Sequence, residues 1–138
     1  MKKIIAILTV SGFMVSGLYA SLGAQAGKSV KEGVFTAEQA KRGETLYKEN
    51  CAACHGEDLA GSGPMPALAG NDFIANWKTV GDLFEKTHTS MPASAPGSLS
   101  EQQTSDIIAF MLAKSNFPPG QAELANKQAD LMLIKIEK

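Results

Sequence analysis

The sequence has little cysteine, few long apolar runs and no pattern typical of a sheet. Its two cysteines, Cys51 and Cys54, stand too close together to link distant parts of the chain, so a disulfide framework is excluded. Strand-like alternation of apolar and polar residues is not convincing anywhere, and there are no internal repeats or low-complexity tracts. The length of 138 residues predicts one small globular domain.

Positive charge is also scarce. The chain has 13 Lys and Arg side chains against 14 Asp and Glu, and the counts become 11 and 14 without Lys2 and Lys3. A net charge of -3 argues against a nucleic-acid partner and gives no basic patch for anionic lipid. The expected partner is another protein.

The first 26 residues have the features of a secretory signal. Lys2 and Lys3 precede an apolar run from residue 4 to about residue 20, and Ala24-Gln25-Ala26 supplies the small residues of a cleavage site. A retained membrane anchor is the alternative, although a spanning helix needs about 20 apolar residues. We expect cleavage after about Ala26, a periplasmic location and no stable membrane insertion of the mature chain.

Residues 27 to 35 are predicted to be an exposed leader, and residues 36 to 138 to form the domain. Thr36 and Gln39 have the spacing of a capping box that starts a helix reaching about Asn50. Within that helix Ala40, Gly43 and Tyr47 form a narrow stripe, whose glycine would let another backbone come close.

Further helices are predicted between two loops rich in Gly and Pro, at residues 56 to 70 and 87 to 99. A short helix is expected at residues 71 to 76. Capping patterns predict two more, from Thr79 to about residue 86 and from Ser100 to about residue 114. The tail from residue 121 is ambiguous, but its apolar residues could pack as an extended strap; these are Leu131, Leu133, Ile134 and Ile136.

The motif Cys51-Ala52-Ala53-Cys54-His55 is a signal for covalent haem attachment. Two thiols one helical turn apart can add to the two vinyl groups along one haem edge, and the next residue then lies beneath the iron. Cys51 and Cys54 would form thioethers and His55 would be an axial ligand. A large cofactor would also supply apolar surface that the sequence lacks.

Two other sites use the same residue types. A thioredoxin-like dithiol needs a strand before the motif and a helix after it, whereas a helix and then a Gly/Pro loop are predicted here. A zinc site could add His88 to Cys51, Cys54 and His55, but adjacent Cys54 and His55 do not match the usual zinc spacings. His88 is expected to be a surface residue at a helix end.

From about residue 33 to residue 136 the chain resembles the class I cytochrome c family, an all-α fold with three main helices, short helices and loops around one haem. The haem motif, Pro66-Ala67-Leu68, Met91-Pro92 and the helix with Ile107 and Phe110 occur in family order. Within the family the chain is most similar to monohaem domains that accompany quinoprotein (PQQ-dependent) dehydrogenases, which share patterns such as Asn116-Phe117-Pro118.

The resemblance implies roles for residues outside the motif. It makes Met91 the second axial ligand to the haem iron, beside His55, and gives the Pro66 carbonyl the task of orienting the His55 ring. It places Gly43 and Tyr47 across from Ile107 and Phe110, and Trp77 near the haem, within reach of a propionate. Met91 and Trp77 could instead be ordinary core residues, and Pro66 a turn residue.

The predicted function is electron transfer on one covalently bound haem c, with no substrate transformed by the chain. The resemblance implies an exported dehydrogenase as donor and another cytochrome or a terminal oxidase as acceptor. One alternative is a haem peroxidase or gas sensor with an open sixth position on the iron, which requires that Met91 not bind iron. Another is a haem subunit of a membrane-bound dehydrogenase complex, which a retained N-terminus would favour.

Overall fold

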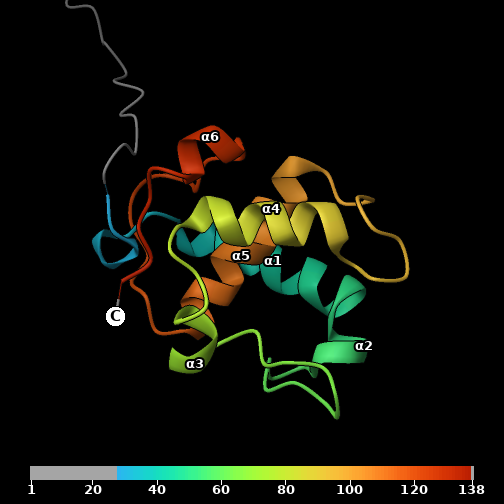
Figure 1. Ribbon diagram of the computed structural model, residues 1–138. Coiled ribbons are helices and arrows are strands. Elements are labelled where there is room, and N and C mark those ends of the chain that lie inside the picture. Colours follow the sequence, from blue (N-terminus) through green and yellow to red (C-terminus); the bar gives the residue numbers. More distant parts are fainter. Residues whose placement is uncertain (1–27, 138) are drawn as a thin grey trace, which may run out of the picture.

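The computed structural model describes residues 28–137, which form an all-α fold (Figure 1). The predicted signal segment lies outside the described residues. In the described part there are isolated bridges but no strands, and no helix is long and apolar enough to cross a membrane. The fold class is confirmed, with three main helices and four short ones: η1 (Val30–Glu32), α1 (Ala37–Asn50), α2 (Ala52–His55), α3 (Asn71–Ile74), α4 (Val80–Ser90), α5 (Glu101–Lys114) and α6 (Gln128–Leu131).

Helices α1 and α5 cross with their backbones in contact. A Cβ atom added to Gly43 would lie 1.8 Å from the carbonyl oxygen of Asp106, so only glycine fits at the crossing. One turn further on, the rings of Tyr47 and Phe110 pack at a centroid distance of 5.4 Å. The predicted crossing of the first and last main helices is therefore confirmed.

Capping residues begin the main helices as predicted, but α4 is longer than expected. Capping boxes are formed by Thr79 with Asp82 and by Ser100 with Gln103. Helix α4 continues to Ser90, so the predicted end near residue 86 is wrong. In its last turns the hydroxyls of Thr87, Thr89 and Ser90 each donate to the carbonyl four residues earlier.

The capping box predicted for α1 is only half formed. The Thr36 hydroxyl accepts from the backbone N–H of Gln39, but the Gln39 side chain does not return to Thr36. It is fully buried and bonds to the backbone of Leu124 instead. The Gln39 side chain, which the local pattern assigned to the cap, therefore makes a tertiary contact instead.

The segment before α1 is not the exposed leader that was predicted. Val30, Val34 and Phe35 are buried, because this segment pairs with the end of the chain. Lys135 donates its N–H to the Lys28 carbonyl and accepts from the N–H of Val30. The prediction is therefore wrong for residues 28 to 35, whose apolar side chains belong to the core.

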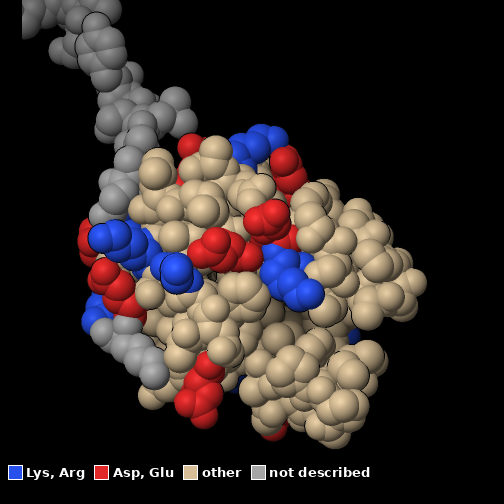
Figure 2. Space-filling view, in the orientation of Figure 1, with Lys and Arg blue, Asp and Glu red and all other residues tan. Residues whose placement is uncertain are grey.

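The tail packs largely as the predicted strap. Leu131, Ile134 and Ile136 are buried, whereas Leu133 is exposed, and the strap begins with the short helix α6. The two Gly/Pro loops lie on the other side of the molecule, at the right of Figures 1 and 2. In Figure 2 the right side of the molecule is formed by two largely tan lobes with a cleft between them.

Candidate functional site

The C-x-x-C-H motif begins at Cys51, which lies between α1 and α2, and its other four residues form α2. Cys51 ends α1, with its N–H bonded to the Tyr47 carbonyl, and accepts from the N–H of His55 one turn later. The Tyr47 hydroxyl donates to the Gly56 carbonyl at 2.7 Å and closes this turn. The fold therefore holds the two cysteines and His55 on one compact turn.

The thiol of Cys51 is not activated. Its burial, followed by the effect of Cys54, raises its pKa to about 11, so the neutral thiol dominates at neutral pH. Catalytic dithiols rely on a lowered thiol pKa. Moreover, the motif is preceded by the helix α1 and followed by a loop, which is not the strand-then-helix context of a thioredoxin-like site.

His55 is fixed by the loop that follows it. Its Nδ1 lies 2.9 Å from the carbonyl oxygen of Pro66, and because a carbonyl only accepts, Nδ1 carries the proton. The other ring nitrogen, Nε2, keeps a free lone pair. The structure thus gives His55 the tautomer and the orientation that a metal ligand requires.

Gly61 lets the segment that carries Pro66 pack closely against the residues that follow His55. Its φ is +84°, its N–H donates to the His55 carbonyl, and an added Cβ would lie 2.4 Å from the Met65 carbonyl oxygen. Sequence reasoning did not single out Gly61, because the loop contains several glycines that look alike. The close approach that distinguishes it is a tertiary feature.

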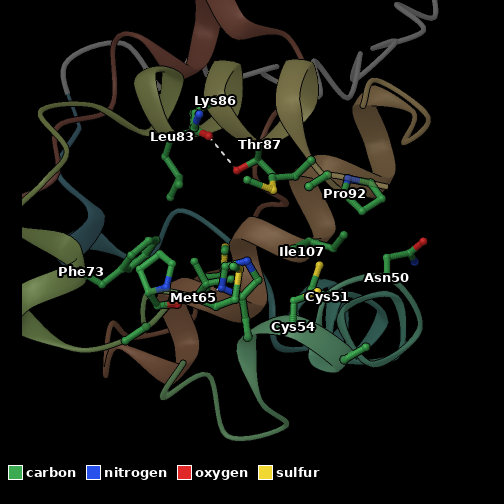
Figure 3. Close-up of a pocket in the computed structure, with 18 of the residues that line it drawn as sticks. Asn50, Cys51, Cys54, Met65, Phe73, Leu83, Lys86, Thr87, Pro92 and Ile107 are labelled. Carbon is green, nitrogen blue, oxygen red and sulfur yellow. Dashed lines mark hydrogen bonds between the residues drawn. The ribbon is translucent and has the colours of Figure 1, made fainter. Parts of the chain in front are cut away.

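A cavity of about 430 Å³ lies beside the motif (Figure 3). Cys51 and Cys54 lie at one wall, and α4 with Thr87 and Pro92 forms the wall across from them. Met91, the residue directly after α4, lines the cavity and is partly buried. The remaining lining is largely apolar, with Phe73, Leu83, Ile107 and Met111 among its residues.

Met91, Met65 and His88 lie differently with respect to the cavity. Met65 and Met91 both line the cavity, but Met65 immediately precedes Pro66, on the His55 side. His88 does not line it. Its ring stacks on Phe84 and its Nδ1 bonds to the Thr104 hydroxyl at 3.2 Å, so it is half-buried rather than a plain surface residue.

Trp77 lines the cavity and packs edge-on against Phe73. Its indole Nε1 is buried and is the one such side-chain atom among residues 28–137 without a hydrogen-bond partner. Buried donors nearly always have partners, so this N–H points to a polar group of a bound molecule. The predicted neighbourhood of Trp77, Met91, Pro66 and the motif is thus brought together around one cavity.

Residues 38–111 match the family model described as "Cytochrome C oxidase, cbb3-type, subunit III", which covers more than half of the chain. The chain belongs to this family of c-type cytochrome domains. Its cofactor is accordingly haem c, an iron porphyrin bound covalently, and its role is that of an electron carrier. The family assignment made from the sequence is confirmed.

Curated relatives are similar over parts of their length. Cytochrome c-551 of Bacillus subtilis (strain 168) is 43% identical over 67 residues, which is 46% of this chain and 59% of the relative. The cytochrome c subunit of the quinone alcohol dehydrogenase of Gluconobacter oxydans (strain 621H) is 35% identical over 86 residues, 53% of this chain and 18% of the relative. The chain thus covers less than two thirds of these relatives.

Two further comparisons agree with the family. The cbb3-type oxidase subunit CcoP of Rubrivivax gelatinosus is 31% identical over 81 residues, 55% of this chain and 26% of that protein. Among solved structures, the sulfane dehydrogenase SoxCD from Paracoccus pantotrophus matches with a TM-score of 0.55 at 23% identity, over 76% of this chain and 53% of that one. This last likeness supports the fold alone.

The cavity of the cytochrome has the groups that haem c needs. It offers two thiols on one turn, an imidazole with a free Nε2, a thioether sulfur at Met91 and a mostly apolar lining. The unpartnered N–H of Trp77 supplies a donor for a polar edge group such as a propionate. No three His, Cys, Asp or Glu side chains in the described part of the chain form a metal-binding group on their own.

Proposed function

We propose that the cytochrome transfers single electrons on a haem held by Cys51 and Cys54, with His55 and Met91 as axial ligands. The observation that carries this proposal is the fixed His55 ring, whose Nδ1 donates to Pro66 while its Nε2 remains free beside a cavity that Met91 also lines. Haem iron supplies the redox chemistry by alternating between its ferrous and ferric forms.

The protein's own residues hold this centre and tune it. The Pro66 carbonyl makes the imidazole of His55 more electron-rich through the Nδ1–H bond, which favours ferric iron. The Met91 thioether favours ferrous iron and raises the reduction potential. The unpartnered N–H of Trp77 would supply a donor to a propionate, and the apolar lining would limit the access of water to the iron.

We further propose the cellular setting that the sequence indicates. Residues 1–26 are a signal removed after about Ala26, the cytochrome domain with its strap includes residues 28–35, and the mature protein works in the periplasm. An exported dehydrogenase, of the quinoprotein kind, supplies electrons, and another cytochrome or a terminal oxidase accepts them. The relative that forms the cytochrome subunit of a quinone alcohol dehydrogenase supports this choice of donor.

Covalent attachment gives the direct test of the site. Produced in a host competent in cytochrome c maturation, the protein should keep its haem through acid–acetone extraction and gain the mass of one haem. It should also be reduced and reoxidised reversibly. The Cys51→Ala, Cys54→Ala double variant should lose its haem in the same extraction. A colourless or zinc-containing parent protein would contradict the proposal.

The donor is tested separately by stopped-flow mixing. A reduced quinoprotein dehydrogenase from the same organism should reduce the cytochrome rapidly. Rapid reduction by an unrelated donor, with every such dehydrogenase inactive, would reject this donor and leave the electron-carrier role intact.

A further inference from the structure

Met91 begins a loop that has little support of its own. The loop runs from residue 91 to residue 99, between the end of α4 and the start of α5, and most of its residues are exposed. Its backbone bonds, from Ala95 to the Pro92 carbonyl and from Ser98 to the Ala95 carbonyl, close turns within the loop. These bonds do not reach either helix, so the position of Met91 depends on how the two helices are held together.

Two hydrogen bonds connect the two sides of the loop just outside it. His88, one turn before Met91, has its Nδ1 3.2 Å from the Thr104 hydroxyl, and that hydroxyl donates to the Ser100 carbonyl at 3.0 Å. Among residues 28–137, the bond between His88 and Thr104 is the one hydrogen bond that joins α4 to α5. We call the chain of bonds from His88 through Thr104 to Ser100 the loop clamp.

The direction of each bond in the loop clamp follows from the chemistry of the hydroxyl. A threonine hydroxyl has one hydrogen, and the Ser100 carbonyl, which can only accept, takes it. The Thr104 oxygen therefore accepts from His88, so Nδ1 of His88 carries a proton. An asparagine side chain also has an N–H donor at the second atom beyond Cβ, whereas alanine has none.

The loop clamp is sheltered from water. Thr104 is fully buried, and His88 is half-buried with its ring stacked on the buried Phe84 at a centroid distance of 5.4 Å. Water therefore replaces these bonds poorly when they break. His88, Thr104 and Ser100 do not line the haem cavity, so the clamp can affect the iron only through the loop and Met91.

We propose that the loop clamp keeps Met91 on the haem iron, so that His88 and Thr104 are positioning residues for the sixth ligand. This inference rests on the proposed function, in which Met91 is that ligand. Release of Met91 moves the loop and the end of α4 away from the cavity, whereas α5 stays packed against α1. The clamp exists only while the end of α4 lies against α5. It therefore stabilises the form with Met91 bound relative to the form with an open iron position.

Cyanide binding to the ferric haem protein tests the loop clamp, because cyanide takes the position that Met91 leaves. Its apparent affinity is proportional to the fraction of molecules in which Met91 is off the iron. Loss of one hydrogen bond that holds the closed form raises this fraction about fivefold. His88→Ala should therefore bind cyanide about fivefold more tightly than the parent. It should still keep the methionine charge-transfer band, since Met91 stays bound in most molecules.

Two further variants test the bond itself. His88→Asn restores a donor for Thr104 and should bring the apparent affinity for cyanide back to within about twofold of the parent. Thr104→Val removes the hydroxyl but keeps the shape of the side chain, and it should bind cyanide as tightly as His88→Ala. The double variant should bind no more than about twofold more tightly than either single variant, because both changes remove the same bond.

Two controls separate the loop clamp from other effects of substitution. Thr89→Val removes a hydroxyl that bonds within α4, to the Glu85 carbonyl. Gln39→Ala removes the buried bonds to Leu124 and measures what a general loss of stability does to cyanide binding. Both variants should bind cyanide within about twofold of the parent, since neither change touches the clamp.

Three results would overturn the loop clamp alone: an unchanged cyanide affinity in His88→Ala, an equal tightening in Gln39→Ala, or a His88→Asn variant that binds as tightly as His88→Ala. In each case the parent still shows the methionine band and the proposed function stands. A parent without that band, or a band that survives in Met91→Ala, would contradict ligation by Met91 and, with it, the clamp.

Discussion

Gln39 and Leu124 are joined by two hydrogen bonds in the interior of the protein. The N–H of Leu124 donates to Gln39 Oε1 at 2.6 Å, and Gln39 Nε2 donates to the Leu124 carbonyl at 3.1 Å. Ser105, on α5, donates to the same carbonyl. One side chain of α1 therefore satisfies the backbone of the C-terminal segment and ties that segment to both crossing helices.

Gln39→Ala should lower the free energy of unfolding by about 2 to 4 kcal/mol, because it leaves the buried N–H of Leu124 without a partner and removes packed atoms. Urea unfolding of the haem protein measures this change. Gln128→Ala removes the same kind of side chain from an exposed position and should change the stability by less than about 0.5 kcal/mol. Similar losses in both variants would show that the Gln39 bonds do not stabilise the fold.

Met91→Ala should abolish the weak ferric charge-transfer band that methionine ligation gives at the red end of the visible spectrum. It should also lower the reduction potential and allow carbon monoxide to bind, because a position on the iron becomes free. Met65→Ala is the matched control, since Met65 lines the same cavity. It should keep the band, as should His88→Ala. Loss of the band in Met65→Ala alone would show that the ligand assignment is wrong.

Gly61→Ala should raise the reduction potential. Its added Cβ collides with the Met65 carbonyl and pushes Pro66 away from His55, so the imidazole becomes less electron-rich and ferric iron is less favoured. Gly63→Ala is the control, because Gly63 also has a positive φ but has open space around it. Spectroelectrochemical titration measures both, and an equal shift in the two variants would contradict a role through His55.

The Tyr47 phenol should make the free energy of unfolding depend on pH above about pH 10. Burial, followed by the charges of Cys51 and Asp58, raises its pKa from about 10 to about 12 in the folded state. Between these values the unfolded chain loses the phenol proton while the folded protein keeps it, so the contribution of Tyr47 to stability falls as the pH rises. Below pH 10 this contribution is constant.

Tyr47→Phe should therefore be less stable than the parent at pH 7, by about 1 to 2 kcal/mol, since the Gly56 carbonyl loses its donor. The gap should narrow above pH 10 and reverse in sign as the pH approaches 12, because a shift of two pKa units is worth about 2.7 kcal/mol, more than the lost hydrogen bond. Denaturant unfolding at several pH values measures it in both proteins. A gap that stays constant up to pH 12 would mean that the pKa of Tyr47 is not raised by folding.

Local sequence signals were sufficient for much of the architecture. The capping pairs Thr79–Asp82 and Ser100–Gln103 and the close-packed Gly43 act within one helix or at one crossing, so spacing alone reveals them. The C-x-x-C-H motif is local in the same sense. The main helices, the crossing of α1 and α5 and the family could therefore be predicted from the sequence.

Contacts between segments distant in the sequence could not be predicted from it. Gln39 was assigned to a cap but bonds to Leu124, and His88 was assigned to the surface but packs between Phe84 and Thr104. The leader was expected to be exposed because nothing in residues 28 to 35 indicates that Lys135 pairs with them. In each case the deciding partner lies in a part of the fold that local sequence spacing does not identify.

The pairing of Lys28 and Val30 with Lys135 has a consequence for how the cytochrome can be attached to something larger. It brings both ends of the described chain to one side of the molecule, the left of Figure 1, while the loops around the haem cavity lie at the right. A tether joined at either end, whether a lipid-embedded helix or a fused enzyme domain, would attach the molecule on the side opposite the haem cavity. The loops around the haem cavity would then point away from the attachment point. The length of the tether would set the distance over which they can contact other proteins.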